Sequence, residues 1–205
     1  MLTLYYAPGA CSMAAHIVLE ESGEKYEAKQ VDLAKGEQRT EAYLKIHPLG
    51  RVPVVQFDGG YVFESAAICL HLGDLHPEAG LIGALGTQVR ALAYQWSIFA
   101  PSELEPPLIE AAIYRETEPE RAEKARGRFF KAADAVAQSL DGAEYLVDGR
   151  FGVADVLVST ALSFAMRAKF PEPLPAVLDD CLTRLFARPA YQRALERASA
   201  APASS

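Results

Sequence analysis

Residues 2–23 read LTLYYAPGACSMAAHIVLEESG and contain the signals of a strand, a loop and a helix, in that order. The first five of these residues are rich in strand-forming types, and Pro8 with Gly9 ends the run. Residues 12–22 are predicted to form a helix, because Gly23 follows directly as a left-handed cap. This opening predicts an N-terminal region that mixes strands with helices.

The residues that follow continue the same alternation of short elements. Strands are predicted at 26–31, 52–57 and 61–63, and helices at 37–44 and 65–72. Turn signals lie at residues 48–50 and at 58–60. The order strand, helix, strand, helix, strand, strand, helix predicts a mixed four-stranded sheet, partly parallel and partly antiparallel.

After Pro77 the pattern changes to one that is typical of helices. Gly80, Gly83 and Gly86 mark a linker over residues 80–86. From residue 87 onward, apolar residues recur at intervals of three and four, which predicts a core of about four to six packed helices. We therefore expect an α/β domain over residues 1–79 and an all-α domain over residues 87–205.

Composition and charge exclude several functions. Of the 205 residues, 20 are Lys or Arg and 27 are Asp or Glu, so the net charge of −7 argues against a nucleic-acid partner. No uninterrupted apolar run reaches the roughly 18–20 residues of a membrane span. We expect no secretory signal and a cytoplasmic location, because no basic stretch precedes an apolar run at the start. The spacing of the three cysteines and four histidines predicts no metal site.

The loop between the first strand and the first helix contains Cys11 and Ser12. Free N–H groups and the dipole at a helix start favour negative charge and lower a thiol pKa from about 8.5 toward roughly 3.5–7.5. The alternative is an inert buried thiol at Cys11 and a simple cap at Ser12. Tyr5 and Tyr6 are further candidates, because a phenol can donate to a thiolate, although at least one of the two rings is expected in the core.

Two further segments could bind a ligand. A cis bond before Pro53 would turn the backbone N–H and C=O of Val52 toward an extended peptide, but only about 5–6% of X–Pro bonds are cis, so the spacing alone does not predict one. Glu64 and Ser65 precede a helix, where Ser65 and free N–H groups would bind a carboxylate and Glu64 an ammonium group. The alternative is simple capping by Ser65.

These three sites, followed by a helical domain, resemble a cytosolic glutathione transferase over nearly the whole chain. The opening LYYAPGACSMAAHIVLEESG and the segment HPLGRVPVV, residues 47–55, are most similar to the bacterial beta class. The resemblance implies that residues 1–79 form a thioredoxin-like domain that binds glutathione and that the Val52–Pro53 bond is cis. It also implies that residues 87–205 contribute the site for the electrophile.

The resemblance assigns roles to individual residues. Glu64 and Ser65 would hold the γ-glutamyl group, Val52 with Pro53 the cysteinyl part, and Lys35 the glycyl carboxylate. Arg51 is expected to add positive charge toward the anionic ligand. Ser102 would be a contact from the helical domain. The catalytic candidates beside the glutathione sulfur are Cys11, Ser12 and Tyr6, and the candidate walls of the second-substrate pocket are Met13, Phe99 and Leu108.

The implied activity is conjugation of reduced glutathione to hydrophobic electrophiles, a detoxification reaction. Glutathione acts as co-substrate, so no further cofactor is expected, and family members are usually homodimers. Two other functions stay open: a monothiol thiol–disulfide oxidoreductase acting through Cys11, and a non-catalytic ligand-binding protein with this fold.

The chain departs from the beta-class pattern at three places. Glu105 stands where a His is common, and Ile98 lies where an Asn is usual. In the segment FGVAD, residues 151–155, Asp155 is expected to reach back to the start of a helix, but Gly152 replaces the more usual Ser or Thr.

Overall fold

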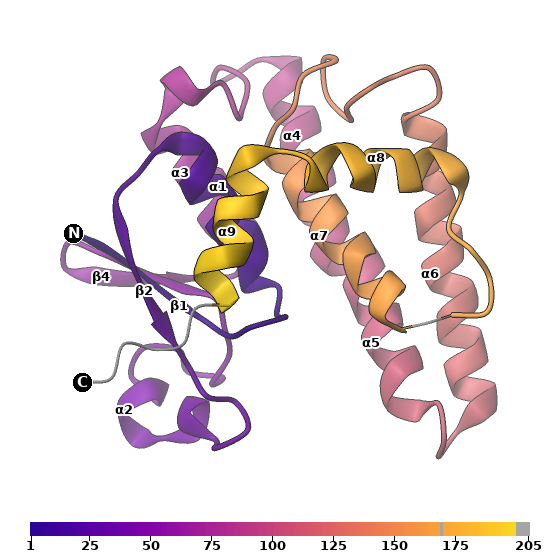
Figure 1. The fold of residues 1–205 in the computed structure, drawn as a ribbon, viewed down its shortest axis with the longest axis horizontal. Coiled ribbons are helices and arrows are strands. Elements are labelled where there is room, and N and C mark those ends of the chain that lie inside the picture. The colour runs from indigo at the N-terminus through magenta and orange to yellow at the C-terminus, as the bar shows by residue number, and fades with distance from the viewer. Residues whose placement is uncertain (169, 200–205) are drawn as a thin grey trace. The chain divides into compact units, whose positions relative to one another are not determined.

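The computed structural model describes residues 1–168 and 170–199 and shows two compact units (Figure 1). The first comprises Met1–Gly80 together with the C-terminal helix α9, Pro189–Ser199. The second is Leu81–Phe186. The two architectures are those predicted, an α/β unit and a helical unit.

The first unit is built on a four-stranded sheet in the order β2-β1-β3-β4. Its strands are β1 (Leu2–Tyr6), β2 (Tyr26–Gln30), β3 (Val54–Phe57) and β4 (Gly60–Phe63). β1 pairs in parallel with β2 and antiparallel with β3, and β3 pairs antiparallel with β4. The mixed sheet is therefore confirmed, and it is the thioredoxin-like arrangement.

The helices of this unit occupy both faces of the sheet. They are α1 (Ser12–Ser22), α2 (Glu41–Leu44) and α3 (Ser65–Leu75), with single 3₁₀ turns at Glu37–Arg39 and Pro77–Ala79. The side chains of Leu4 and Val55 are fully buried, as are those of Ile17 and Leu19 on α1. On the other face, Tyr43 of α2 packs with Val54 and its neighbours.

Several predicted boundaries in this unit differ from the structure, and two of these differences lie at the candidate site. The strand expected at residue 52 begins only at Val54, because Pro53 has no N–H group to donate to the sheet. Ser65, expected as the N-cap of the next helix, is instead the first residue of α3, and Glu64 is the N-cap.

The second unit is helical throughout its regular elements. Its helices are α4 (Gln88–Phe99), a π-helical segment (Ala100–Leu104), α5 (Glu105–Tyr114), α6 (Pro119–Ser139), α7 (Val153–Ala168) and α8 (Ala176–Phe186). Pro101 lies at the start of the π-helical segment, where its missing N–H group and its ring prevent regular α-helical bonding. On α6 the buried residues recur at helical spacing, namely Ala125, Phe129, Ala133 and Val136, whereas on α7 the whole run from Val153 to Leu162 is buried.

The start of α7 confirms the expected role of Asp155. Its buried carboxylate accepts hydrogen bonds from Gly152 N at 2.9 Å and from Leu146 N at 2.9 Å. Gly152 is required for a steric reason, because a Cβ there would lie 2.6 Å from the carbonyl oxygen of Leu81. The departure from Ser or Thr is thus explained by close backbone contact.

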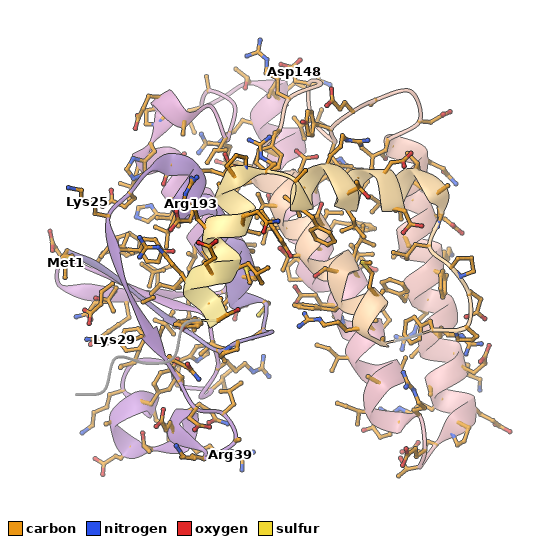
Figure 2. The ribbon with its side chains drawn as sticks, viewed as in Figure 1. Met1, Lys25, Lys29, Arg39, Asp148 and Arg193 are labelled. Carbon is orange, nitrogen blue, oxygen red and sulfur yellow. The ribbon has the colours of Figure 1, made fainter. Side chains whose placement is uncertain are left out.

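The last helix differs from the predicted division of the chain, which placed residues 87–205 in one helical domain. α9 packs on α1, and its buried residues are the small side chains Ala190, Ala194 and Ala198. Arg193, labelled on α9 in Figure 2, bonds to Glu20 of α1 at 2.8 Å, and Arg188 bonds to Glu21 at 2.6 Å. These ion pairs explain why the helix belongs to the first unit.

Candidate functional site

Cys11 occupies the junction between the β1 loop and α1. It is the N-cap residue of α1 and is partly exposed. Its Sγ donates to the carbonyl oxygen of Val52 at 3.5 Å, so the thiol lies beside the segment that precedes β3. Two regions that are 41 residues apart in the sequence therefore meet at this sulfur.

Ser12, the neighbouring candidate, points inward. Only 1% of its surface is exposed, and its hydroxyl donates to Ala7 O at 3.1 Å while accepting from Ala7 N at 3.3 Å. The hydroxyl thus closes the loop over residues 7–12 on itself. It supports the loop that carries Cys11 and is not presented at the surface.

The two candidate phenols donate to other acceptors. Tyr6 is buried, its hydroxyl donates to Arg197 O at 3.4 Å, and burial raises the pKa of its phenol. Tyr5 donates to Gln56 Oε1 at 3.2 Å, and burial likewise raises the pKa of its phenol. Each hydroxyl is therefore already bonded to an acceptor other than the Cys11 thiol.

The segment before β3 has the implied backbone geometry, since the Val52–Pro53 bond is cis. The Tyr43 hydroxyl donates to Arg51 O at 2.9 Å, and Leu49 N donates to His47 Nδ1 at 3.1 Å. Both side chains are buried and hold this segment from the inside. Sequence reasoning missed them, because Tyr43 resembles any apolar residue of a short helix and His47 has no nearby pattern to mark it.

Glu64 has an uncommon backbone conformation at the start of α3. Its φ is 74° and its ψ is 118°, a region that non-glycine residues rarely adopt and that costs about 1–3 kcal/mol. Its side chain is exposed, and Ser65 beside it is buried. The side chain of Glu64, the N-cap residue, makes no capping hydrogen bond. The first N–H groups of α3 are therefore available to a ligand acceptor.

Electrostatic interactions connect the groups around Val52. The pKa of His47 is lowered, mainly by burial, and the charges of Glu64 and Arg51 act on it in opposite directions. Arg51 is exposed, and Lys35 is exposed with its Nζ 3.0 Å from Asp32. Hydrogen bonding to the Asp32 carboxylate raises the pKa of Lys35. The Arg51 cation and the Glu64 carboxylate therefore both act on the buried His47, whereas Lys35 is paired with Asp32.

Cys11 is the thiol suited to chemistry. Cys69 and Cys181 are buried, and burial is the main cause of the raised pKa of each. The charge of Cys11 adds to the shift at Cys69. A nucleophilic or hydrogen-bonding role therefore falls to Cys11 among the three.

The remaining predicted residues are described within their own units. In the first unit Met13 is partly buried on α1. In the second, Ser102 is exposed and donates to Phe99 O at 3.5 Å, and the ring of Phe99 packs against Trp96 at 5.2 Å between centroids. Leu108 is only 3% exposed and packs in the interior.

Two absences complete the description of the site. Over residues 1–168 and 170–199, no group of three or more His, Cys, Asp or Glu side chains is arranged to hold a metal ion. Within the same ranges, no helix has the length and apolar character needed to cross a membrane.

The chain matches two family models, which together span most of its length. Residues 1–74 match the model described as glutathione S-transferase, N-terminal domain, and residues 91–189 match glutathione S-transferase, C-terminal domain. Among curated proteins, the chain is similar to glutathione S-transferase GstA of Escherichia coli O157:H7. The two are 29% identical over 197 residues, which cover 95% of this chain and 97% of the relative.

Solved structures give the same result. A sphingomonad glutathione S-transferase complexed with glutathione superimposes with a TM-score of 0.87 at 30% identity, covering 97% of this chain and 100% of the other. A bacterial beta class enzyme from Sphingomonas chungbukensis superimposes with a TM-score of 0.81 at 28% identity, covering 96% and 98% of the two chains.

Proposed function

Because the chain belongs to the glutathione S-transferase family, we propose that it binds reduced glutathione along the edge formed by Cys11, Val52 and Glu64 and transfers the glutathione sulfur to hydrophobic electrophiles. The observation that carries this proposal is the 3.5 Å contact between Cys11 Sγ and Val52 O. It brings a helix start with a thiol together with the backbone that would pair with the cysteinyl part of the tripeptide.

Each part of glutathione has a chemically matched group in the first unit. The γ-glutamyl ammonium pairs with Glu64, and its carboxylate with Ser65 and the N–H groups at the start of α3. The cysteinyl amide pairs with the backbone of Val52 beside Pro53. The glycyl carboxylate is attracted by Lys35 and Arg51.

The reaction requires a thiolate next to the electrophile. The S–H proton of glutathione passes to solvent, the thiolate forms a carbon–sulfur bond, and a leaving group such as halide departs with its electron pair. Cys11 stabilises the thiolate, because its S–H group can donate to it and the start of α1 favours negative charge. Ser12 positions this loop through its bonds to Ala7, whereas the phenol of Tyr6 bonds to the backbone of α9.

A conjugation assay tests this function. The unmodified chain is mixed with glutathione and an activated chloronitrobenzene, and the thioether is followed by absorbance. Turnover is expected, and Glu64→Gln is expected to raise KM for glutathione about tenfold or more, since one charge-assisted bond contributes about 1.5–3 kcal/mol. Glu41→Gln on α2, an exposed carboxylate, is the matched control and should leave KM unchanged. Turnover without any dependence on Glu64 contradicts the site.

Cys11→Ala separates conjugation from the alternative of thiol–disulfide exchange. Exchange through Cys11 needs its thiolate to attack a glutathionylated sulfur and is abolished in this variant. Conjugation is expected to persist at a reduced rate, because the glutathione sulfur supplies the nucleophile. Equal loss of both activities would favour the oxidoreductase.

The same proposal includes the assembly and setting of the protein. We expect a homodimer in the cytoplasm that needs no cofactor besides the co-substrate and that serves detoxification. Met13 of the first unit is partly exposed and is proposed to contact the electrophile. In the second unit Phe99 is partly exposed, whereas the burial of Leu108 favours a packing role. Sedimentation equilibrium of the purified chain would measure the assembly directly.

A further inference from the structure

A cluster of polar side chains lies where α1, β1, β2 and α9 meet, and the conjugation reaction uses none of its charges. We call it the His16 cluster, and its members are Tyr6, His16, Glu20, Tyr26, Arg193 and Arg197. All of them belong to the first unit. His16 lies at its centre and is 0% exposed.

The hydrogen bonds of the cluster run in one chain. His16 Nδ1 lies 3.1 Å from the Tyr26 hydroxyl, which donates to Glu20 Oε1 at 3.1 Å. The Glu20 carboxylate also forms ion pairs with Arg197 Nε at 2.7 Å and with Arg193 Nε at 2.8 Å. Through this carboxylate, His16 is connected to the helix α9.

This network determines which nitrogen of His16 carries its proton. Glu20 receives two arginines and the Tyr26 hydroxyl, so it is an ionised carboxylate that only accepts. The Tyr26 hydroxyl donates its single proton to Glu20, so it can only accept in its contact with His16. The proton in that contact is therefore on His16 Nδ1. Nε2 is left unprotonated, is buried, and has no hydrogen-bond partner among the described residues.

The surroundings of His16 oppose a second proton on the ring. The pKa of His16 is lowered to about 4, chiefly by burial; the charge of Glu20 opposes this shift and that of Arg197 adds to it. The Tyr6 ring of β1 packs edge-on against the imidazole at 4.7 Å and the Tyr26 ring of β2 at 5.8 Å. From α3, the buried ionisable group is Cys69, whose resolved charge interaction is with Cys11.

We propose that His16 is the proton sensor of a latch, and that a proton on its Nε2 releases α9 from α1 while the sheet stays folded. In the docked state that proton has no acceptor and adds positive charge beside Arg197. Once α9 leaves, water reaches the imidazole and solvates the charge. The undocked state therefore binds this proton more tightly than the docked state does, so lowering the pH shifts the equilibrium toward undocking.

The packing of α9 explains why this helix should open before the rest of the unit. Its buried side chains are alanines, Ala190, Ala194 and Ala198, which bury little apolar area. The sheet instead buries the larger side chains of Leu4 on β1 and Val55 on β3 completely. α9 therefore depends on polar contacts more than the sheet does, which is the property of a segment that opens locally.

Hydrogen exchange at controlled pH tests the latch. Amide exchange of the full chain is measured by mass spectrometry from pH 7 to pH 4.5 and corrected for intrinsic exchange. With an ordinary pKa of about 6.5 in the undocked state, the exchange of residues 189–199 is expected to accelerate about tenfold for each pH unit below that value. Residues 54–63 of the sheet should show no comparable change.

Two variants make the test specific. His16→Gln keeps a donor for Tyr26 but cannot titrate, so the acceleration in residues 189–199 should disappear. Glu21→Gln is the matched control, because it breaks the Arg188–Glu21 pair that also holds α9 but lies outside the His16 cluster. It should speed exchange by a constant factor and keep the slope with pH.

Three results would overturn the latch: exchange of α9 that is insensitive to pH, acceleration of residues 54–63 in equal proportion, or an unchanged slope in His16→Gln. Circular dichroism shows whether the His16→Gln chain folds. If it does not, the pH dependence of exchange in residues 189–199 and in residues 54–63 of the unmodified chain still tests the latch.

Discussion

At the residue scale, the neighbours Cys11 and Ser12 are both candidates to contact the glutathione sulfur, and the structure gives them different surroundings. The sequence places a thiol and a hydroxyl side by side at a helix start, and nothing in that pattern says which one faces outward. In the structure Cys11 Sγ reaches Val52 O, whereas the Ser12 hydroxyl bonds twice to the Ala7 backbone. The choice depends on a loop conformation that local sequence signals do not encode.

The buried hydroxyl leads to a stability prediction. Ser12→Ala leaves the Ala7 N–H and C=O without this partner, so the free energy of unfolding should fall by about 1–3 kcal/mol. Urea denaturation followed by circular dichroism measures the difference. Ser139→Ala, whose exposed hydroxyl bonds within α6, is the control and should change stability by less than about 0.5 kcal/mol. An unchanged unfolding midpoint in Ser12→Ala would show that the loop does not need the hydroxyl.

At the element scale, most elements could be predicted because their signals are local. Gly23 ends α1 in the left-handed conformation, and Leu2–Tyr6 form the strand that their strand-favouring residue types predict. The rest depends on contacts distant in the sequence. Tyr43 supports Arg51 from α2, and α9 docks on α1 through Arg193, pairings that periodicity cannot indicate.

The start of α7 gives a prediction at this scale. Asp155→Asn replaces one accepting oxygen by a donor, so either Leu146 N or Gly152 N loses its partner in a buried place. We expect a loss of about 2–3 kcal/mol in the free energy of unfolding, as for other buried charge-assisted bonds. Thermal denaturation measures it, and Asp134→Asn on the exposed face of α6 serves as control. Equal melting temperatures for the two variants would exclude the capping role.

The close contact at Gly152 gives a second prediction for the same helix. Gly152→Ser restores the residue type usual in the family, yet its Cβ would lie 2.6 Å from Leu81 O. The backbone must shift, so the variant should be less stable by about 1–3 kcal/mol, even though serine is the better capping residue elsewhere. Thermal denaturation of Gly152→Ser beside Gly127→Ser, where a Cβ meets nothing within 4 Å, separates the clash from general helix effects. A gain in stability at residue 152 would contradict the steric explanation.

At the scale of the whole molecule, the buried His16 makes stability depend on pH. Its pKa is about 4 in the folded protein and its ordinary value is 6.5, so the unfolded chain binds the proton first as the pH falls. The contribution of the neutral His16 to the free energy of unfolding is therefore fully present above about pH 6.5. It is lost progressively down to about pH 4, and the total loss is about 3 kcal/mol. Urea denaturation of the unmodified chain and His16→Gln at several pH values should show this difference. Parallel pH profiles for the two chains would contradict it.

Binding of glutathione by the first unit is the property on which the conjugation chemistry rests, and isothermal titration calorimetry measures it directly. Reduced glutathione titrated into the unmodified chain should release or absorb heat that saturates at one tripeptide per chain. Ser65→Ala should weaken binding about tenfold, since it removes a hydrogen bond to the ligand carboxylate, while Ser139→Ala should bind as the unmodified chain does. No heat with the unmodified chain, or identical binding by Ser65→Ala, would contradict the site described at Cys11, Val52, Glu64 and Ser65.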